Sequence, residues 1–141
     1  MHFETYGLFV GLALCLFVAD SAGKRHLGSG QVLVACLVAI AAMTLVPLHG
    51  PERLELRPGS AAGLGDVANL LLFAPLGGVL YLRCWSAAKA VATAAAISLA
   101  IELLQRVIPG RTTSIDDVLF NTLGAALGWL LARWFSSRFT E

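Results

Sequence analysis

Long apolar runs, separated by short polar stretches, constrain this chain more than any other feature. They occupy residues 3–19, 31–48, 66–82, 87–108 and 116–135. A helix needs about 20 mostly apolar residues to cross a bilayer, and a helix satisfies all of its own backbone hydrogen bonds there. The runs therefore predict an all-α fold, a polytopic transmembrane bundle of about five helices. Because the first run is short and carries Glu4, a bundle of four is the alternative.

The composition excludes the other broad classes of protein. Hydrophobic residues make up 57% of the 141 positions and charged residues only 13%, too few to cover a water-soluble domain or a disordered chain. The net charge of +1 provides no basic surface for nucleic acid. Cys15, Cys36 and Cys84 are far apart and lack metal-ligand spacing. We therefore expect no metal bound through sulfur, and because no nucleotide or cofactor motif is present, we expect no cofactor.

The basic residues predict an orientation. With five crossings, six of the ten Lys and Arg residues fall on one side of the membrane. They are Lys24, Arg25, Arg83, Lys89, Arg133 and Arg138. The other four are Arg53, Arg57, Arg106 and Arg111. Because the cytoplasmic side carries the excess of Lys and Arg, we expect the amino terminus outside and the carboxyl terminus in the cytoplasm.

The acidic residues divide the opposite way. Seven of the nine fall on the predicted outer side. They are Glu4, Glu52, Glu55, Asp66, Glu102, Asp116 and Asp117. Only Asp20 and Glu141 fall on the inner side. Several of the outer acids lie near the ends of apolar runs rather than in loops. A charged group within a membrane-spanning run costs roughly 2.5–3.5 kcal/mol to insert and tends to mark function.

Helical spacing places polar side chains of three helices at one level. Ser98, Glu102 and Gln105 stand at i, i+4 and i+7 on one face of the fourth predicted helix. Glu102 lies roughly 7 Å past the middle of that helix, at 1.5 Å per residue, and so within the hydrocarbon layer. Similar stripes are formed by Asp66 and Asn69 in the third helix, and by Asp117, Asn121, Gly124 and Gly128 in the fifth. We therefore expect a shared polar pocket near the outer headgroups.

Structural explanations compete with a functional one. Ser114-x-x-Asp117 reads as a capping box at a helix start. Glu102 could form a structural ion pair with Arg106 or Arg111, and either arginine could instead anchor the helix end at the membrane surface. The amide side chains could serve only as interhelical hydrogen bonds.

The segment IELLQRVIPGRTTSIDDVLFNTLGAALGWLL, residues 101–131, resembles the signature half of the VanZ-like family. The matching positions are Glu102, Gln105, Arg111, Asp116, Asp117, Asn121, Gly124 and Gly128. The earlier stretch DVANLLLFAPLGG is similar to the family's Asn-containing helix, at Asn69, Pro75 and Gly77, and Pro47 resembles a proline after its second helix. The chain is thus expected to form one VanZ-like domain over residues 1–141, best matched over 66–131.

The resemblance implies a small integral membrane protein of the bacterial cell envelope, in the cytoplasmic membrane. The family's founding member is associated with resistance to the glycopeptide antibiotic teicoplanin. A broader grouping links the family to chemistry on lipid headgroups, which agrees with a polar cluster at the level of the outer leaflet's phosphates.

The first functional hypothesis is an enzyme acting on a phospholipid or a lipid-linked cell-wall intermediate. Glu102 would be the general acid or base, and Asp116 and Asp117 would orient a nucleophile or bind a divalent cation. Arg111, with Arg106 as the second candidate, would hold a phosphate. The remaining pocket residues would donate or accept hydrogen bonds, namely Asn69, Gln105 and Asn121.

Two other functions use the same residues. A non-catalytic protein would bind a lipid precursor or an antibiotic without turnover. A small transporter would need polar residues at several depths, whereas the inner halves of these helices consist mainly of Ala, Leu, Val and Gly. A purely structural scaffold fits the three polar stripes least well.

Overall fold

The computed structural model describes residues 3–24, 28–45, 63–108 and 114–138, and within these ranges the chain is helical with short turns. Its helices are α1 (Phe3–Lys24), α2 (Ser29–Leu45), α3 (Leu64–Leu82), α4 (Ala87–Gln105) and α5 (Ile115–Arg138). The predicted all-α bundle is confirmed. The outer bounds differ from the apolar runs, since α1 and α5 continue into polar residues. Helix α4 ends at Gln105, three residues before the end of the predicted run at residue 108.

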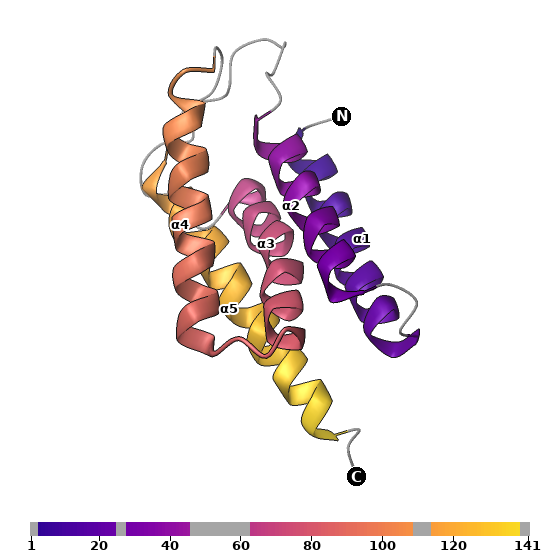
Figure 1. The fold of residues 1–141 in the computed structure, drawn as a ribbon. Helices are drawn as coiled ribbons and strands as arrows, with labels where there is room; N and C mark the ends of the chain where they lie inside the picture. Colours follow the sequence, from indigo (N-terminus) through magenta and orange to yellow (C-terminus); the bar gives the residue numbers. More distant parts are fainter. Residues whose placement is uncertain (1–2, 25–27, 46–62, 109–113, 139–141) are drawn as a thin grey trace.

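Helix α3 lies at the centre of the bundle. Figure 1 shows it between the α1–α2 pair and the α4–α5 pair, and it contacts all four other helices. Helices α1, α3 and α5 run in one direction, and α2 and α4 in the other (Figure 1). The start of α3, the end of α4 and the start of α5 therefore lie at one end of the bundle, which we call the polar end.

Glycines allow α3 and α5 to pack backbone against backbone. A Cβ atom built at Gly124 would overlap the carbonyl oxygen of Leu70, and one at Gly128 would overlap that of Ala74. A Cβ atom built at Gly77 of α3 would likewise overlap the carbonyl oxygen of Ala125. Close approach through small residues is a common basis of helix association in membranes. This glycine seam fixes the position of α5, and with it the first turn of α5 at the polar end.

A proline in α3 is accommodated by α1. Pro75 lies inside α3 and has no N–H to give to the carbonyl of Leu71, four residues earlier. The thiol of Cys15 points at that carbonyl, with 3.9 Å between Sγ and the oxygen. Gly11 lets the α1 backbone approach the same residue, since its Cβ position is 2.9 Å from the Leu71 carbonyl carbon. Helix α1 thus covers the backbone group that the proline exposes.

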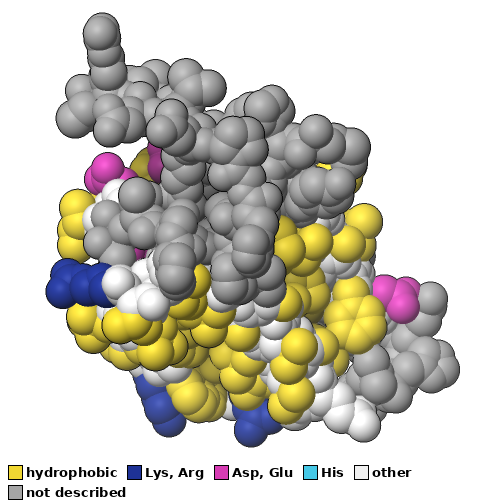
Figure 2. Space-filling model, turned by 90° about the horizontal axis from the view of Figure 1, so that it is seen from above, with side chains coloured by type: hydrophobic (Ala, Val, Ile, Leu, Met, Phe, Trp, Pro, Cys, Tyr) yellow, Lys and Arg dark blue, Asp and Glu magenta, His cyan; other side chains and the backbone are white. Residues whose placement is uncertain are grey.

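Three of the helices are long and apolar enough to cross a membrane, namely α3, α4 and α5. Helix α2 has 17 residues, and the apolar stretch Phe9–Val18 of α1 is shorter. Figure 2 views the bundle along its length from the polar end and shows mainly hydrophobic side chains on its flanks. The chain is therefore a membrane protein with at least three candidate spans, and the fourth and fifth crossings stay a prediction.

The opposite end of the bundle combines aromatic and basic side chains. Lys89 Nζ lies 4.1 Å from the Trp85 ring centre, and the Arg138 guanidinium carbon lies 4.4 Å from that of Trp134. The turn into α4 is closed by Cys84, whose φ of 60° is left-handed. Aromatic and basic residues together are typical of a membrane–water interface.

Candidate functional site

The polar stripe of α4 faces the interior of the bundle. Ser98, Glu102 and Gln105 have exposed fractions of 0%, 6% and 5%. Leu99, Leu103 and other residues on the opposite face are exposed, as lipid contact requires. The three polar residues bond to three different segments of the chain, so the stripe joins α4 to its neighbours at successive levels.

Glu102 lies at the amino terminus of α5. Its Oε2 accepts a hydrogen bond of 2.9 Å from the backbone N–H of Ser114, the residue before α5 begins. Helix amino termini carry a partial positive charge and free N–H groups, so they stabilise a carboxylate. The sequence places Glu102 near the end of its own helix, where the dipole is unfavourable. The favourable dipole comes from α5.

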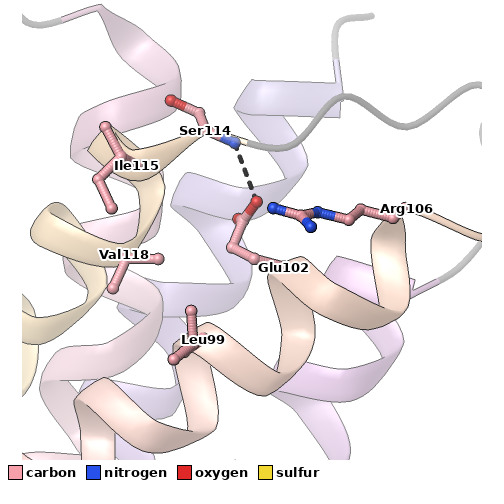
Figure 3. Close-up of a pocket in the computed structure, with 6 residues that line it drawn as sticks. All are labelled: Leu99, Glu102, Arg106, Ser114, Ile115 and Val118. Atoms are coloured by element: carbon pink, nitrogen blue, oxygen red, sulfur yellow. Dashed lines mark hydrogen bonds between the residues drawn. The ribbon is translucent and has the colours of Figure 1, made fainter.

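A pocket of about 130 Å³ lies beside this carboxylate. It is lined by Leu99, Glu102, Arg106, Ser114, Ile115 and Val118. Figure 3 shows the Arg106 side chain extending toward Glu102 across the pocket. The apolar side chains of Leu99, Ile115 and Val118 form the opposite wall. The pocket therefore offers one carboxylate and one guanidinium against an apolar wall, in a chain whose flanks are hydrophobic.

The first turn of α5 carries Asp116 and Asp117. The Ser114 hydroxyl accepts a bond of 3.2 Å from the N–H of Asp116, so Ser114 caps the helix as predicted. The Ser114 N–H, which a capping box would give to Asp117, donates to Glu102. Asp116 is exposed and Asp117 half-buried, and both lie within three residues of the pocket wall.

Asn121 and Ser98 join α5 to α4 below Glu102. Asn121 Nδ2 donates to Ser98 Oγ at 2.8 Å, and Asn121 is only 3% exposed. Gln105 makes the corresponding link to α2, where its Nε2 donates to the carbonyl of Thr44 at 2.7 Å. Both amide nitrogens are thus used between helices. Gln105 Oε1 and Asn121 Oδ1 are buried, and neither has a hydrogen-bond partner within the described part of the chain.

In α3, Asp66 serves its own helix. Its carboxylate accepts a 2.8 Å bond from the N–H of Gly63, the residue that caps α3. Asn69, one turn further on, is half-buried. The structure thus places Asn69, Glu102, Gln105, Asp116, Asp117 and Asn121 at the polar end. Arg106 lines the pocket itself. Arg111 and Pro47 lie outside the described residues.

Sequence reasoning missed two partners of the site. Thr44 was not singled out, because only its backbone carbonyl takes part and no side-chain pattern signals that. The Ser114 N–H is also a backbone group, although the helix start that it marks was recognised. In the described ranges, no group of three His, Cys, Asp or Glu side chains is placed to hold a metal ion.

A known protein family matches this chain. The VanZ/LLP1 family model matches residues 3–136, which is nearly the whole chain. Searches of curated proteins and of solved structures find no match.

Proposed function

The chain belongs to the VanZ/LLP1 family, and from this premise we propose that its polar end binds and chemically alters the headgroup of a membrane lipid. The lipid is a phospholipid or a lipid-linked cell-wall intermediate. The observation that carries the proposal is the Glu102 carboxylate, which is buried between α4 and the start of α5 and borders a pocket with Arg106. A lipid whose tails lie along the apolar flank would present its headgroup at this level.

Each side chain has a role in that proposal. Arg106 holds the lipid phosphate, because a guanidinium provides several N–H donors to phosphate oxygens. Glu102 takes a proton from the attacking hydroxyl or water and returns one to the leaving oxygen. Asp116 and Asp117 orient the attacking group at the start of α5. Hydrogen bonds to the headgroup come from Asn69, Gln105 and Asn121. Arg111, which the sequence predicts near this site, is the second phosphate ligand.

The proposal includes an orientation. The polar end faces the outer leaflet of the bacterial cytoplasmic membrane, with the amino terminus outside and the carboxyl terminus in the cytoplasm. The support is the charge distribution, since Lys89, Arg133 and Arg138 belong to the opposite end, where α4 begins and α5 finishes. Altered outer-leaflet lipids would also connect the protein to glycopeptide susceptibility.

A non-catalytic lipid- or antibiotic-binding protein is the second candidate. The bond between Glu102 and Ser114 favours it, because the carboxylate stabilises the start of α5 whether or not a reaction takes place. In that case Arg106→Gln should impair the protein more than Glu102→Gln. For an enzyme the order is reversed.

Mass spectrometry of lipid extracts tests the proposal. Cells carrying no copy, the native chain, Glu102→Gln or the control Asp20→Asn are compared at equal protein levels. Asp20 is exposed and belongs to α1, away from the pocket. A lipid species that changes with the native chain and with the control, but not with Glu102→Gln, supports an enzyme. If Glu102→Gln produces the same change, the carboxylate has no catalytic role.

A further inference from the structure

Basic and aromatic side chains are paired at the end of the bundle opposite the polar end, which we call the basic end. Three tryptophans are each followed, four residues later, by a basic residue: Trp85 by Lys89, Trp129 by Arg133 and Trp134 by Arg138. Lys89 Nζ lies 4.1 Å from its ring centre, and the guanidinium carbons of Arg133 and Arg138 lie 5.7 Å and 4.4 Å from theirs. An aromatic ring attracts a cation through its negative face, so it positions the side chain and leaves most N–H donors for another partner.

Two of these pairs are joined into one cluster. The Trp129 indole N–H donates to the Trp85 carbonyl at 2.9 Å, and Trp129 packs edge-on against Tyr81 with ring centres 5.4 Å apart. Trp129 is only 8% exposed, whereas Lys89 and Arg133 are exposed. Helical side chains lean toward the amino terminus of their own helix, and α4 and α5 run in opposite directions (Figure 1). Both cationic groups are therefore brought to the level of the contact between the two tryptophans.

The cations of this cluster have no acidic partner within the described part of the chain. Neither Lys89 nor Arg133 forms an ion pair there. The basic end also carries Arg83, whose Nη1 donates to Ser29 Oγ at 3.5 Å. The acidic residue that the described ranges contribute to this end is Asp20 of α1, and α1 packs against α2 and α3 but not against α4 or α5. A cluster of one sign of charge attracts an anion.

Apolar side chains extend from the cluster along the flank of the bundle. On α4, Ala92 and Ala96 follow Lys89, and on α5 the cluster is preceded by Leu123 and Leu127; these four apolar residues are exposed. From the cluster they lead toward the polar end, and so into the membrane, which is the direction that the acyl chains of a lipid take. A soluble anion would use only the charges, whereas a phospholipid would use both the charges and this flank.

We propose that the basic end binds an anionic phospholipid, whose phosphate is held by Lys89 and Arg133 and whose acyl chains lie along α4 and α5. Basic side chains from neighbouring membrane helices recur at such headgroup sites, and both an ammonium and a guanidinium bind phosphate oxygens. The lipid links the start of α4 to the second half of α5. In the proposed orientation it belongs to the cytoplasmic leaflet, and its binding needs no reaction at the polar end.

Two lipids that share a phosphate diester test the charge requirement. Phosphatidylglycerol has a net negative charge, whereas the choline of phosphatidylcholine cancels the phosphate charge and would bring a cation to the cluster. Purified full-length protein in a neutral detergent is titrated with each lipid, with matched acyl chains, and bound lipid is measured by native mass spectrometry. We expect phosphatidylglycerol to bind at least about tenfold tighter, because each basic group near the membrane surface contributes about fivefold.

Single substitutions assign the preference to the cluster. Lys89→Gln and Arg133→Gln should each weaken phosphatidylglycerol binding about fivefold, and Arg133→Lys, which keeps the charge, should retain most of the affinity. Arg83→Gln is the matched control, since it removes one charge from the same end at a residue that bonds Ser29, and it should change the affinity less than about twofold. Lys89 is exposed in the first turn of α4, so Lys89→Gln tests the proposal even if Arg133→Gln does not fold.

The outcomes also separate this site from the proposed site at the polar end. If native protein binds phosphatidylcholine as tightly as phosphatidylglycerol, the anionic-lipid site is refuted. It is refuted as well if Lys89→Gln and Arg133→Gln weaken binding no more than Arg83→Gln does. Arg106→Gln should leave the preference for phosphatidylglycerol in place. A loss of that preference in Arg106→Gln, with none in Lys89→Gln or Arg133→Gln, would place the lipid at the polar end and overturn the proposal.

Discussion

A single methyl group at Gly77 should weaken the bundle, whereas the same group at the adjacent Gly78 should not. A Cβ at Gly77 would overlap the Ala125 carbonyl oxygen and would lie 2.7 Å and 2.9 Å from that residue's carbonyl and α carbons. All three are backbone atoms of α5 and cannot swing aside, so α3 and α5 would have to separate. At Gly78 the nearest atom to a Cβ is the Gly128 oxygen at 3.7 Å, an ordinary contact.

The two substitutions differ only in this packing. Both replace Gly by Ala in the middle of α3, so both gain about 1 kcal/mol of helix propensity. Overpacking at Gly77 should then lower the free energy of unfolding by about 1–3 kcal/mol relative to Gly78→Ala. Reversible unfolding in mixed detergent micelles, followed by tryptophan fluorescence, measures the difference. Equal stabilities for Gly77→Ala and Gly78→Ala would refute the backbone-to-backbone packing of α3 and α5.

The same unfolding assay checks three further substitutions. Asn121→Ala removes the bond to Ser98 and should lower the free energy of unfolding by about 0.6–1.7 kcal/mol; no change would show that the bond contributes nothing. Cys84→Gly relieves a left-handed φ of 60° and should raise stability by roughly 1 kcal/mol, so a lower stability would contradict the turn geometry. Trp129→Phe removes the 2.9 Å bond from Nε1 to the Trp85 carbonyl and should lower stability by about 1 kcal/mol. A variant as stable as the native chain would contradict that contact.

Side-chain periodicity was sufficient to find the inward face of α4. Ser98, Glu102 and Gln105 are spaced for one face, and all three are buried in the structure. Asn121 and Gly128 on α5 are likewise buried. An isolated polar stripe in an apolar helix has only the protein interior to face, so its orientation follows from the sequence alone.

The partners of these side chains could not be predicted in the same way. Glu102 bonds a backbone N–H of the next helix, and Gln105 bonds a backbone carbonyl of α2. Backbone groups have no sequence signature, and their positions depend on how the helices pack. The close packing of α3 with α5 likewise depends on pairs of residues, such as Gly124 with Leu70, that are distant in the chain.

The role of Asp66 at the start of α3 could not be predicted from the sequence either. Asp66 looked like a member of the polar pocket, but its carboxylate accepts the N–H of Gly63 and caps its own helix. An acidic residue at the third position of a helix can serve either purpose. Whether Asp66 caps the helix or belongs to the pocket depends on where α3 begins, which is Leu64 rather than Asp66.

The most direct test of the central claim is a reaction of purified protein with membrane lipids, followed by phosphorus NMR. Native protein in lipid micelles should produce a new headgroup resonance over time, and Asp20→Asn should produce it at the same rate. Glu102→Gln, folded to the same extent, should leave the lipid spectrum unchanged. An unchanged spectrum with native protein, or an equal rate with Glu102→Gln, would contradict catalysis by the Glu102 carboxylate at the polar end.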